Sequence, residues 1–501
     1  MAVGLERFEF VAHAFVAATG PHAAVGWTWL TDLWARLGSA FGIAQPIAGS
    51  TADLPPRAPE ADGVVAARTA SAPGVHQAVV RRVGDVVCLS VVRAPTAGGP
   101  RWDTFDAEWS AVLPTPTAGV LGVARILQAQ LDDPAQPVDA AALGPVVAGM
   151  LPVAGDWSSR GIVRPEGSWG PFAVWEASGP SAAEDRADRR IVVVVGHDRD
   201  DPLSAWTWSL GEELAPLAHY LLHAAKTRFQ MRLWSADGAA GRSALRRATD
   251  QAIAPLLRLS DEVVEGGEPR PEALLAATTP LVRLRVSEAD LADRASRLHD
   301  IARVVEIAAN NMATRARRDQ AGGLFLDDAE LARWMQRQLG HDAAFLESAA
   351  DRARAVAALG DHLVTRGLAT RRERVNLILT GVIGAVVAVL TAIQAFGYQV
   401  PLAEPAKAAV IPPVIAAIGA LALVLYMAVL PTVPERRSAS AAARSVTLGL
   451  LAAMTAWLVT AVACTLSGLP LPAPASLTAG AAAVGIAATA VSMWFLRRSV
   501  T

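Results

Sequence analysis

The sequence has 501 residues, of which 52% are hydrophobic and only 18% are charged, and its mean hydropathy is +0.32. A soluble domain is about half apolar and about a quarter charged, so some part of this chain is unusually poor in charge. The net charge of −2 offers no basic excess for nucleic acid, and the apolar content excludes a disordered polyelectrolyte. Two isolated cysteines suit neither a disulfide framework nor a zinc site, and we expect no cofactor.

Residues 1–203 mix strand and helix patterns, which predicts an α+β domain. The β-rich runs 75–83 and 85–93 are joined tightly at Gly84, as in a hairpin. Residues 191–195 are apolar throughout, which is typical of a buried central strand. The segment from about 47 to 74 is rich in proline, alanine and glycine and is expected to be a loose linker. Further strands are expected at 5–16 and 172–176, and helices at 21–42 and 102–113.

Residues 204–372 are expected to form a helical stalk. Ser287 with Asp290, and Asp327 with Glu330, have the spacing of helix N-caps. We therefore predict an antiparallel hairpin of helices over 287–321 and 327–371, with earlier helices at 204–232 and 241–264 packed against it. The first helix of the hairpin carries apolar residues at alternating spacings of four and three, a heptad seam: Leu291, Ala295, Leu298, Ala302, Val305, Ala309 and Met312.

Residues 373–501 are the part of the chain that is poorest in charge. No charged side chain occurs within 375–403, 408–434 or 445–496. A helix needs ~20 apolar residues to cross the core of a bilayer. The fold class expected for the whole chain is therefore an α+β N-terminal domain, a helical stalk and a four-helix C-terminal transmembrane region. The four spans are predicted at about 375–397, 408–430, 446–467 and 475–496.

Arginines at the ends of these predicted spans indicate the orientation. All of them would lie on one side of the membrane, and arginine clusters mark the cytoplasmic side. We expect a multi-pass protein of the bacterial inner membrane with both termini cytoplasmic. The predicted spans contain no ionisable side chain, which argues against active transport and favours an anchor, with a homo-oligomeric pore left open. The orienting arginines are Arg371, Arg372, Arg374, Arg436, Arg437, Arg444, Arg497 and Arg498.

Two clusters of side chains are candidate metal or catalytic sites. Asp198, Asp200 and Asp201 follow the strand at 191–195, where ligands of α/β sheets often bind, and their carboxylates suit Mg²⁺. Arg199 partly neutralises this loop and Pro202 indicates the turn before a helix, so we favour a solvated loop with a helix N-cap over a metal site. His219 and His223 are four residues apart on a predicted helix, which suits zinc, but no third ligand is evident. We find no phosphate-binding loop and no nucleophile elbow, and we expect no enzymatic activity.

Two stretches resemble the CATRA proteins, the caspase- and tetratricopeptide-repeat-associated components of predicted bacterial conflict systems. The first is EFVAHAFVAATGPHAAVGWTWLTDLWARLG, and the second is RRERVNLILTGVIGAVVAVLTAIQAFGYQVPL. The resemblance covers about 60 residues. It implies a helper protein that acts beside a separately encoded caspase-like protease and repeat proteins. It transfers no catalytic residue to this chain.

The sequence leads to a membrane-anchored, non-enzymatic component of a conflict system that binds a caspase-like or repeat-protein partner and signals to the membrane. Two alternatives remain open at this point. One is an oligomeric ion channel with the outline of CorA-type magnesium transporters, although the Gly-Met-Asn filter is missing. The other is an enzyme with an unrecognised site in the N-terminal domain.

Overall fold

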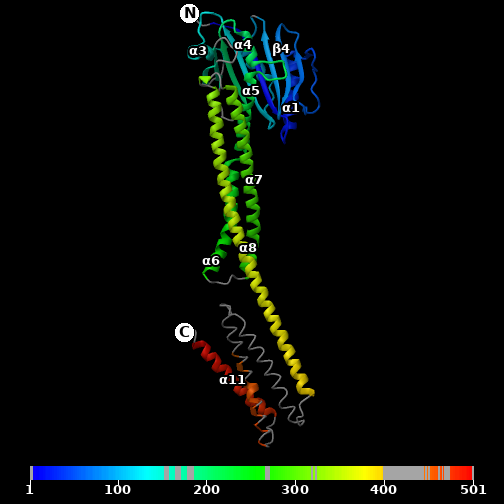
Figure 1. Ribbon diagram of the computed structural model, residues 1–501, viewed down its shortest axis with the longest axis vertical. Helices are drawn as coiled ribbons and strands as arrows, with labels where there is room; N and C mark the ends of the chain where they lie inside the picture. The colour runs from blue at the N-terminus through cyan, green and yellow to red at the C-terminus, as the bar shows by residue number, and fades with distance from the viewer. Residues whose placement is uncertain are drawn as a thin grey trace. The chain divides into compact units, whose positions relative to one another are not determined.

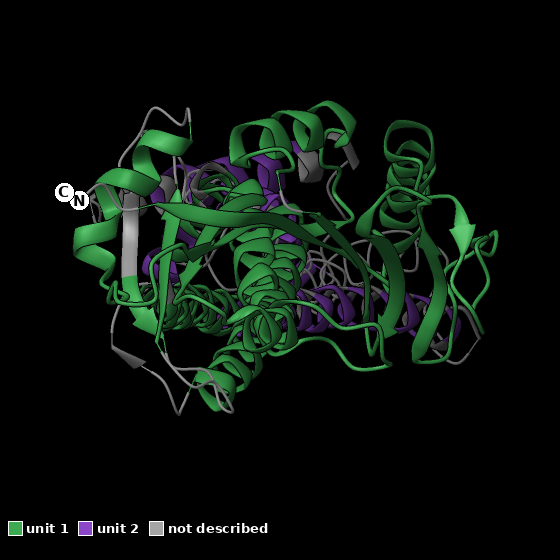
Figure 2. Ribbon diagram, turned by 90° about the horizontal axis from the view of Figure 1, so that it is seen from above, with its two compact units in different colours: residues 1–257, 279–357 green, residues 258–278, 358–501 purple. Residues whose placement is uncertain are grey.

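The computed structural model describes residues 4–96, 98–151, 157–163, 171–177, 186–265, 271–316, 320–321, 324–398 and 474–498, with a few residues between 445 and 467. The chain divides into two compact units, coloured separately in Figure 2. The first unit comprises residues 1–257 and 279–357, and the second comprises residues 258–278 and 358–501. The domain boundaries predicted at 203 and 372 stay a prediction.

A twisted sheet forms the N-terminal part of the first unit (Figure 1). Its strand order is β10-β7-β8-β9-β6-β1-β5-β4-β3-β2. All neighbouring strands are antiparallel except β6 and β9, which run parallel. The strands are β1 Leu5–Ala17, β2 Gln45–Pro46, β3 Gly63–Thr69, β4 Gly74–Val83, β5 Val86–Pro95, β6 Val120–Leu131, β7 Trp157–Val163, β8 Phe172–Ala177, β9 Asp188–Val195 and β10 Gln320–Ala321.

Helices cover both faces of this sheet. Apolar side chains of α1 (Ala23–Phe41), α2 (Trp102–Val112) and α3 (Ala140–Met150) form one core with the first face. Side chains of α4 (Asp200–Thr207), α5 (Pro216–Asp237), α7 (Pro271–Ala316) and α8 (Leu324–Tyr398) form the other core. Alternate residues of a strand point to opposite faces, so a strand covered on both sides is buried along its length, as β6 is throughout and β9 is from Ile191 to Val195.

Most elements predicted in the N-terminal part are confirmed. The strand at 5–16, the hairpin at Gly84 and the central strand at 191–195 occur as β1, β4–β5 and β9. The prediction of a loose linker from about 47 to 74 is wrong in part, because residues 63–69 form β3, which pairs with β4. This strand lies near the edge of the sheet, where only β2 follows it, so a composition poor in large apolar residues is tolerated there.

The helical region of the first unit is a bundle. α7 and α8 run antiparallel: His299 contacts Glu347 at 2.8 Å, and Glu288 accepts a hydrogen bond from Arg354 at 2.7 Å. α6 (Ala239–Val264) joins them through Asp250, which accepts from Arg352 at 2.6 Å. The predicted heptad seam is confirmed as the face of α7 that is packed in the core.

Three helix boundaries differ from the prediction. The helix expected at 204–232 is two helices, α4 and α5, because Pro216 occupies the first turn of α5, where its missing N–H costs nothing. The helix expected from Ser287 begins at Pro271 and continues through Pro280. The next begins at Leu324 rather than Asp327 and runs without a break to Tyr398.

The prediction of four transmembrane helices is wrong. Among the residues that the structure describes, no helix combines the length and the apolar character needed to cross a membrane. The predicted span 375–397 falls on the end of α8 and 475–496 on α11 (Pro474–Arg498). The span 408–430 lies outside the described residues, and 446–467 is described only in part.

The prediction relied on the absence of charge, which does not by itself make a segment apolar enough. Small and hydroxyl side chains bury little apolar surface, and alanine, glycine, serine and threonine make up more than half of α11. The orienting role of the arginines stays a prediction: Arg371, Arg372 and Arg374 lie inside α8, Arg497 and Arg498 end α11, and Arg436, Arg437 and Arg444 lie outside the described residues. The CorA-like alternative depended on the same spans.

The contact between α1 and the loop before β6 gives a test of the packing. A Cβ added at Gly119 would lie 2.3 Å from the backbone nitrogen of Gly26 and 2.5 Å from the carbonyl oxygen of His22. We expect Gly119→Ala to lower the free energy of unfolding by about 2–3 kcal/mol. The control is Gly340→Ala in α8, where the added Cβ meets nothing within 4 Å and is expected to stabilise by about 1 kcal/mol. Chemical denaturation measures both, and equal effects would contradict the packing.

Candidate functional site

The predicted aspartate loop lies where expected, beyond the carboxyl ends of the parallel strands β6 and β9. Asp200 is 3.7 Å from Arg7 and, with Asp201, occupies the first turn of α4, where the helix dipole favours negative charge. Asp198 is largely exposed and contacts His197 at 3.3 Å. Within the described residues, no group of three or more His, Cys, Asp or Glu side chains is arranged to hold a metal ion. The loop therefore consists of surface ion pairs and a helix N-terminus.

A strained backbone accompanies this edge of the sheet. Among the described residues, Arg7 (φ 50°) and Asp198 (φ 55°) are the only non-glycine residues with positive φ. Arg7 lies in an irregularity of β1 between Glu6 and Glu9. Burial, and then the charge of Asp200, raise the pKa of Glu9 to about 7 against its ordinary 4.5, and Glu9 accepts a hydrogen bond from Gln128 at 2.6 Å. Glu9 can thus exchange a proton near neutral pH, a property that its sequence position did not indicate.

His219 and His223 share one face of α5, as their spacing predicted. Their rings stack with centroids 5.2 Å apart. Burial foremost, and then neighbouring cations, lower the pKa of both, that of His223 to about 4. Both imidazoles are therefore neutral near pH 7, but the described residues supply no third ligand beside them.

A buried hydrogen-bond network joins the sheet to the end of α4. His13 Nε2 lies 3.0 Å from the Thr207 carbonyl oxygen, so this nitrogen donates, and Nδ1 accepts from the Ser90 hydroxyl at 2.9 Å. The Thr207 hydroxyl donates to Gln128 at 3.0 Å. The pair His13–Ser90 has the residue types of a nucleophilic dyad, but each side chain is only 1% exposed. No substrate reaches them, so the network is structural.

Cys88 belongs to the same interior. Its Sγ lies 3.6 Å from the Ser90 hydroxyl, and burial raises the pKa of the thiol to about 11. The thiol stays protonated at neutral pH and is unreactive, because the thiolate is the nucleophile.

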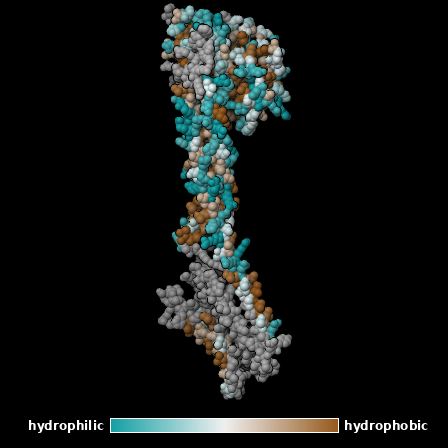
Figure 3. All heavy atoms as spheres, viewed as in Figure 1, coloured by the Kyte–Doolittle hydropathy of each residue, from teal (hydrophilic) through white to brown (hydrophobic). Residues whose placement is uncertain are grey.

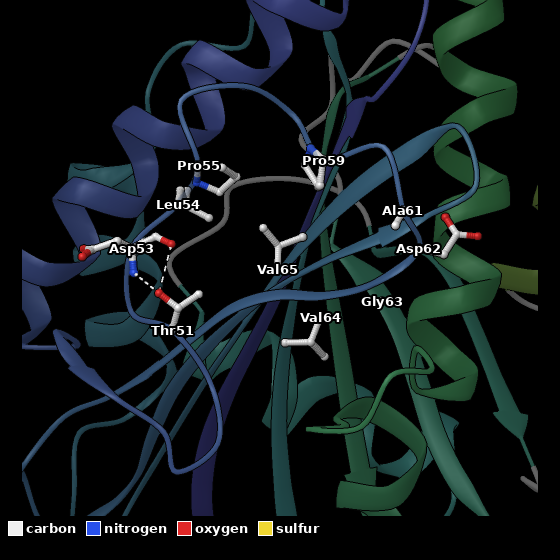
Figure 4. A pocket seen from close by; sticks show the side chains of 10 residues that line it. All are labelled: Thr51, Asp53, Leu54, Pro55, Pro59, Ala61, Asp62, Gly63, Val64 and Val65. Atoms are coloured by element: carbon white, nitrogen blue, oxygen red, sulfur yellow. Dashed lines mark hydrogen bonds between the residues drawn. The ribbon is translucent and has the colours of Figure 1, made fainter.

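An open pocket is lined by the segment before β3 and by the start of β3 (Figure 4). It has a volume of about 540 Å³ and is open to solvent. The two carboxylates of the lining form ion pairs with arginines that do not line the pocket. Asp53 pairs with Arg68 at 3.4 Å, and Asp62 pairs with Arg82 at 3.8 Å. The remaining lining is mostly apolar, without the convergent polar groups that mark a small-molecule site.

A cluster of buried charges connects the sheet to the helices. Arg189 of β9 donates to both carboxylate oxygens of Glu176 in β8, each at 2.8 Å, and Arg186 donates to the same carboxylate at 2.8 Å. Burial alone would raise the pKa of Glu176, but the adjacent arginines, Arg189 foremost, hold it well below its usual range. Glu176 is therefore ionised in the folded protein.

The helical side of this cluster is centred on Asp328 in the first turns of α8. Its Oδ2 accepts from Arg189 at 3.2 Å and from the Tyr220 hydroxyl at 3.0 Å. Its Oδ1 lies 2.6 Å from Arg228 of α5. Burial, and then the charge of Asp328, raise the pKa of Tyr220. We call the set the junction cluster: Glu176, Arg186, Arg189, Tyr220, Arg228 and Asp328.

The His13 network predicts a pH dependence. Burial lowers the pKa of His13 from 6.5 to about 4 in the folded chain, so the unfolded chain binds the proton more readily. Stability is therefore lost as the pH falls from about 6.5 to about 4, by about 3 kcal/mol in total. Glu9 acts in the opposite direction, because its raised pKa adds stability as the pH falls from about 7 to 4.5.

Glu9 is present in both the wild type and a His13→Gln variant. Its contribution to the pH dependence of stability therefore cancels when the two proteins are compared. The difference in unfolding free energy between wild type and variant should shrink as the pH falls through this window, measured by urea denaturation at pH 7, 5.5 and 4.5. A difference that stays constant would contradict a neutral buried His13.

Two family models match this chain, and the boundary between the two matches lies just before α5. The CASPASE and TPR Repeat-Associated N-terminal domain, CATRA-N, matches residues 9–211, and the corresponding C-terminal domain, CATRA-C, matches residues 215–353. The first stretch that resembled the family lies inside the CATRA-N match, whereas the second, at 371–402, lies beyond both. Searches of curated proteins and of solved structures gave no match. Since the two matches cover more than half of the chain, the protein belongs to the CATRA family.

Proposed function

We propose that this chain is a non-enzymatic component of a conflict system, and that it binds a caspase-like protease or a tetratricopeptide-repeat protein through the outer face of α7. Its CATRA domains point to a component of a caspase- and repeat-associated conflict system. The finer role, binding without catalysis, rests on two features of the first unit. These are the structural use of its buried polar groups and the apolar side chains that α7 leaves exposed.

The outer face of α7 carries the proposal. Val282, Val286, Val304 and Ile307 each expose between 37% and 62% of their surface. Val282 and Val286 are one turn apart, as are Val304 and Ile307, and the 18 residues from Val286 to Val304 make five whole turns. The four side chains therefore share one face and form two apolar pairs that are separated by ~27 Å.

Charged residues fill the space between the two pairs. Asp293 and Arg297 form an exposed ion pair of 2.6 Å, and Asp300 is exposed one turn further on. The space-filling view shows apolar side chains between polar ones on these helices (Figure 3). An apolar stripe with charged positions on a helix suits the groove of a repeat protein, which reads such anchors at helical spacing.

The absence of catalysis is supported by what the polar residues do. His13 and Ser90 are sealed in the core, and the carboxylates Glu176 and Asp328 are saturated by arginines. The Cys88 thiol is held protonated by burial. Each residue type that ordinarily supplies a nucleophile or a base is therefore committed to the structure at these positions.

The test uses charge on the outer face of α7. Val282→Glu and Ile307→Glu place carboxylates in the two apolar pairs, and both positions are exposed, so folding should be unaffected. We expect each variant to weaken binding to a purified caspase-like protease or tetratricopeptide-repeat protein from the same genome at least about tenfold, measured by calorimetry. Arg333→Glu on α8, which is also exposed, is the matched control.

Two outcomes would contradict the proposal. One is unchanged affinity in both α7 variants. The other is a wild-type chain that forms a dimer in light scattering and dissociates on Ile307→Glu, because the face would then be covered by a second copy instead of a partner.

A further inference from the structure

The C-terminal part of α8 carries a stripe of exposed apolar side chains. They belong to the second unit and lie on one continuous helix that ends at Tyr398. Each exposes between 53% and 58% of its surface. The space-filling view shows apolar side chains gathered along this part of the helix (Figure 3). We call the set the α8 stripe: Val375, Leu379, Ile383, Val386, Val387 and Leu390.

Helical geometry places the α8 stripe on one face of the helix. With 3.6 residues per turn, its six side chains lie within an arc of about 120° around the helix axis. Among the described side chains of this part of α8, Leu377 is the exposed large apolar residue that lies outside the arc. A continuous patch of this kind marks an interaction surface, unlike apolar residues that are scattered singly.

The spacing of the α8 stripe indicates which kind of surface covers it. Leu379, Ile383, Val386 and Leu390 follow one another at intervals of four, three and four residues, and the other two valines flank this seam. Two helices form a coiled coil when each has apolar residues every 3.5 residues, and a second copy of α8 supplies the same seam. Six such side chains on each of two copies supply an area on the order of 1,000 Å², the lower bound for a specific interface.

Asn376 indicates the direction of the pairing. It is exposed and occupies the seam position three residues before Leu379. In a parallel pair the two Asn376 amides meet and hydrogen-bond to each other. An antiparallel pair centred on Ile383 would instead set each Asn376 against Leu390 and bury the amide without a partner, which is costly. A single asparagine in an apolar seam fixes the register of a coiled coil in this way.

We propose that the α8 stripe joins two copies of this chain in a parallel coiled coil, with the two Asn376 side chains in register. The interface is small, so the dimer dissociates at micromolar concentrations of the chain. The proposal does not rest on the function proposed above, because that function uses the outer face of α7 and a different protein as partner. Each of the two surfaces can therefore be tested without the other.

Sedimentation equilibrium of the full chain tests the dimer. The mass should rise with concentration from 52.3 kDa towards twice that value. Ile383→Glu places a carboxylate in the seam and should raise the dissociation constant at least about tenfold. The matched control is Ile307→Glu on α7, because the two isoleucines are 55% and 53% exposed. The control should leave the dimer unchanged, and circular dichroism checks that both variants fold.

Two results of this experiment would overturn the proposal. One is a wild-type chain that stays monomeric at all concentrations. The other is a dimer that Ile383→Glu leaves intact, or that both variants weaken equally. Loss of partner binding in Ile307→Glu with an intact dimer would support both proposals, whereas an intact partner complex would contradict only the proposal for α7.

Oxidative cross-linking tests the direction of the pairing. In a parallel coiled coil, Asn376→Cys places two thiols at the seam within reach of a disulfide. In the antiparallel pair the two thiols would be ~21 Å apart, because 14 residues separate positions 376 and 390. We expect a disulfide-linked dimer for the variant, and none for the wild type, which retains Cys88 and Cys464. No cross-link in the variant, or the same cross-link in the wild type, would overturn the parallel pairing.

Vesicles of phosphatidylcholine separate a second copy from a lipid surface as the occupant of the α8 stripe. The wild type and Ile383→Glu should sediment with the vesicles to the same extent. Vesicle binding by a monomeric wild type that Ile383→Glu abolishes would show that lipid covers the stripe, and it would overturn the proposal.

Discussion

The junction cluster is the interaction on which the rest of this structure depends. Charges buried to this degree are tolerated only when they are paired and hydrogen-bonded. Arg189 satisfies Glu176 within the sheet and Asp328 on α8 at the same time. Separating the helices from the sheet would therefore break the buried ion pair between Arg189 and Asp328. The cluster fixes where α8 begins relative to β9.

The two CATRA domains consequently share one interior. Side chains of β1, β6 and β9 pack in the same core as side chains of α5, α7 and α8. The boundary between the family matches, near residue 213, is a boundary in sequence, while the packing across it is continuous within the first unit. The bundle uses the heptad face of α7 for this core and leaves the opposite face outward. A rigid base with a fixed apolar helix face is a suitable platform for binding a protein partner.

Local patterns predicted what depends on local physics. The strand at 5–16, the apolar run of β9 and the heptad seam beginning at Leu291 reflect burial on a regular element, and each is found. Segments without charge predicted the structure less well. We took the absence of charge as evidence of a transmembrane helix, but no described helix has the length and apolar character needed to cross a membrane.

The junction cluster could not be predicted from the sequence, for a different reason. Arg189 and Asp328 are separated by 139 residues, and nothing in the local sequence of either indicates the other. Nothing in the local sequence of Glu9 indicates its environment, yet burial and Asp200 give it a pKa of about 7. The histidines His219 and His223 were paired correctly by their spacing. Their environment, which decides between metal binding and packing, comes from other parts of the chain.

A double-mutant cycle between Arg189 and Asp328 tests the central claim most directly. The free energy of unfolding of the full chain would be measured by denaturant titration for wild type, Arg189→Met, Asp328→Asn and the double variant. Each single change should cost about 3–5 kcal/mol, and the double variant should cost at least about 1 kcal/mol less than their sum. Costs that add within about 0.5 kcal/mol would show that the two residues act independently and would contradict the account.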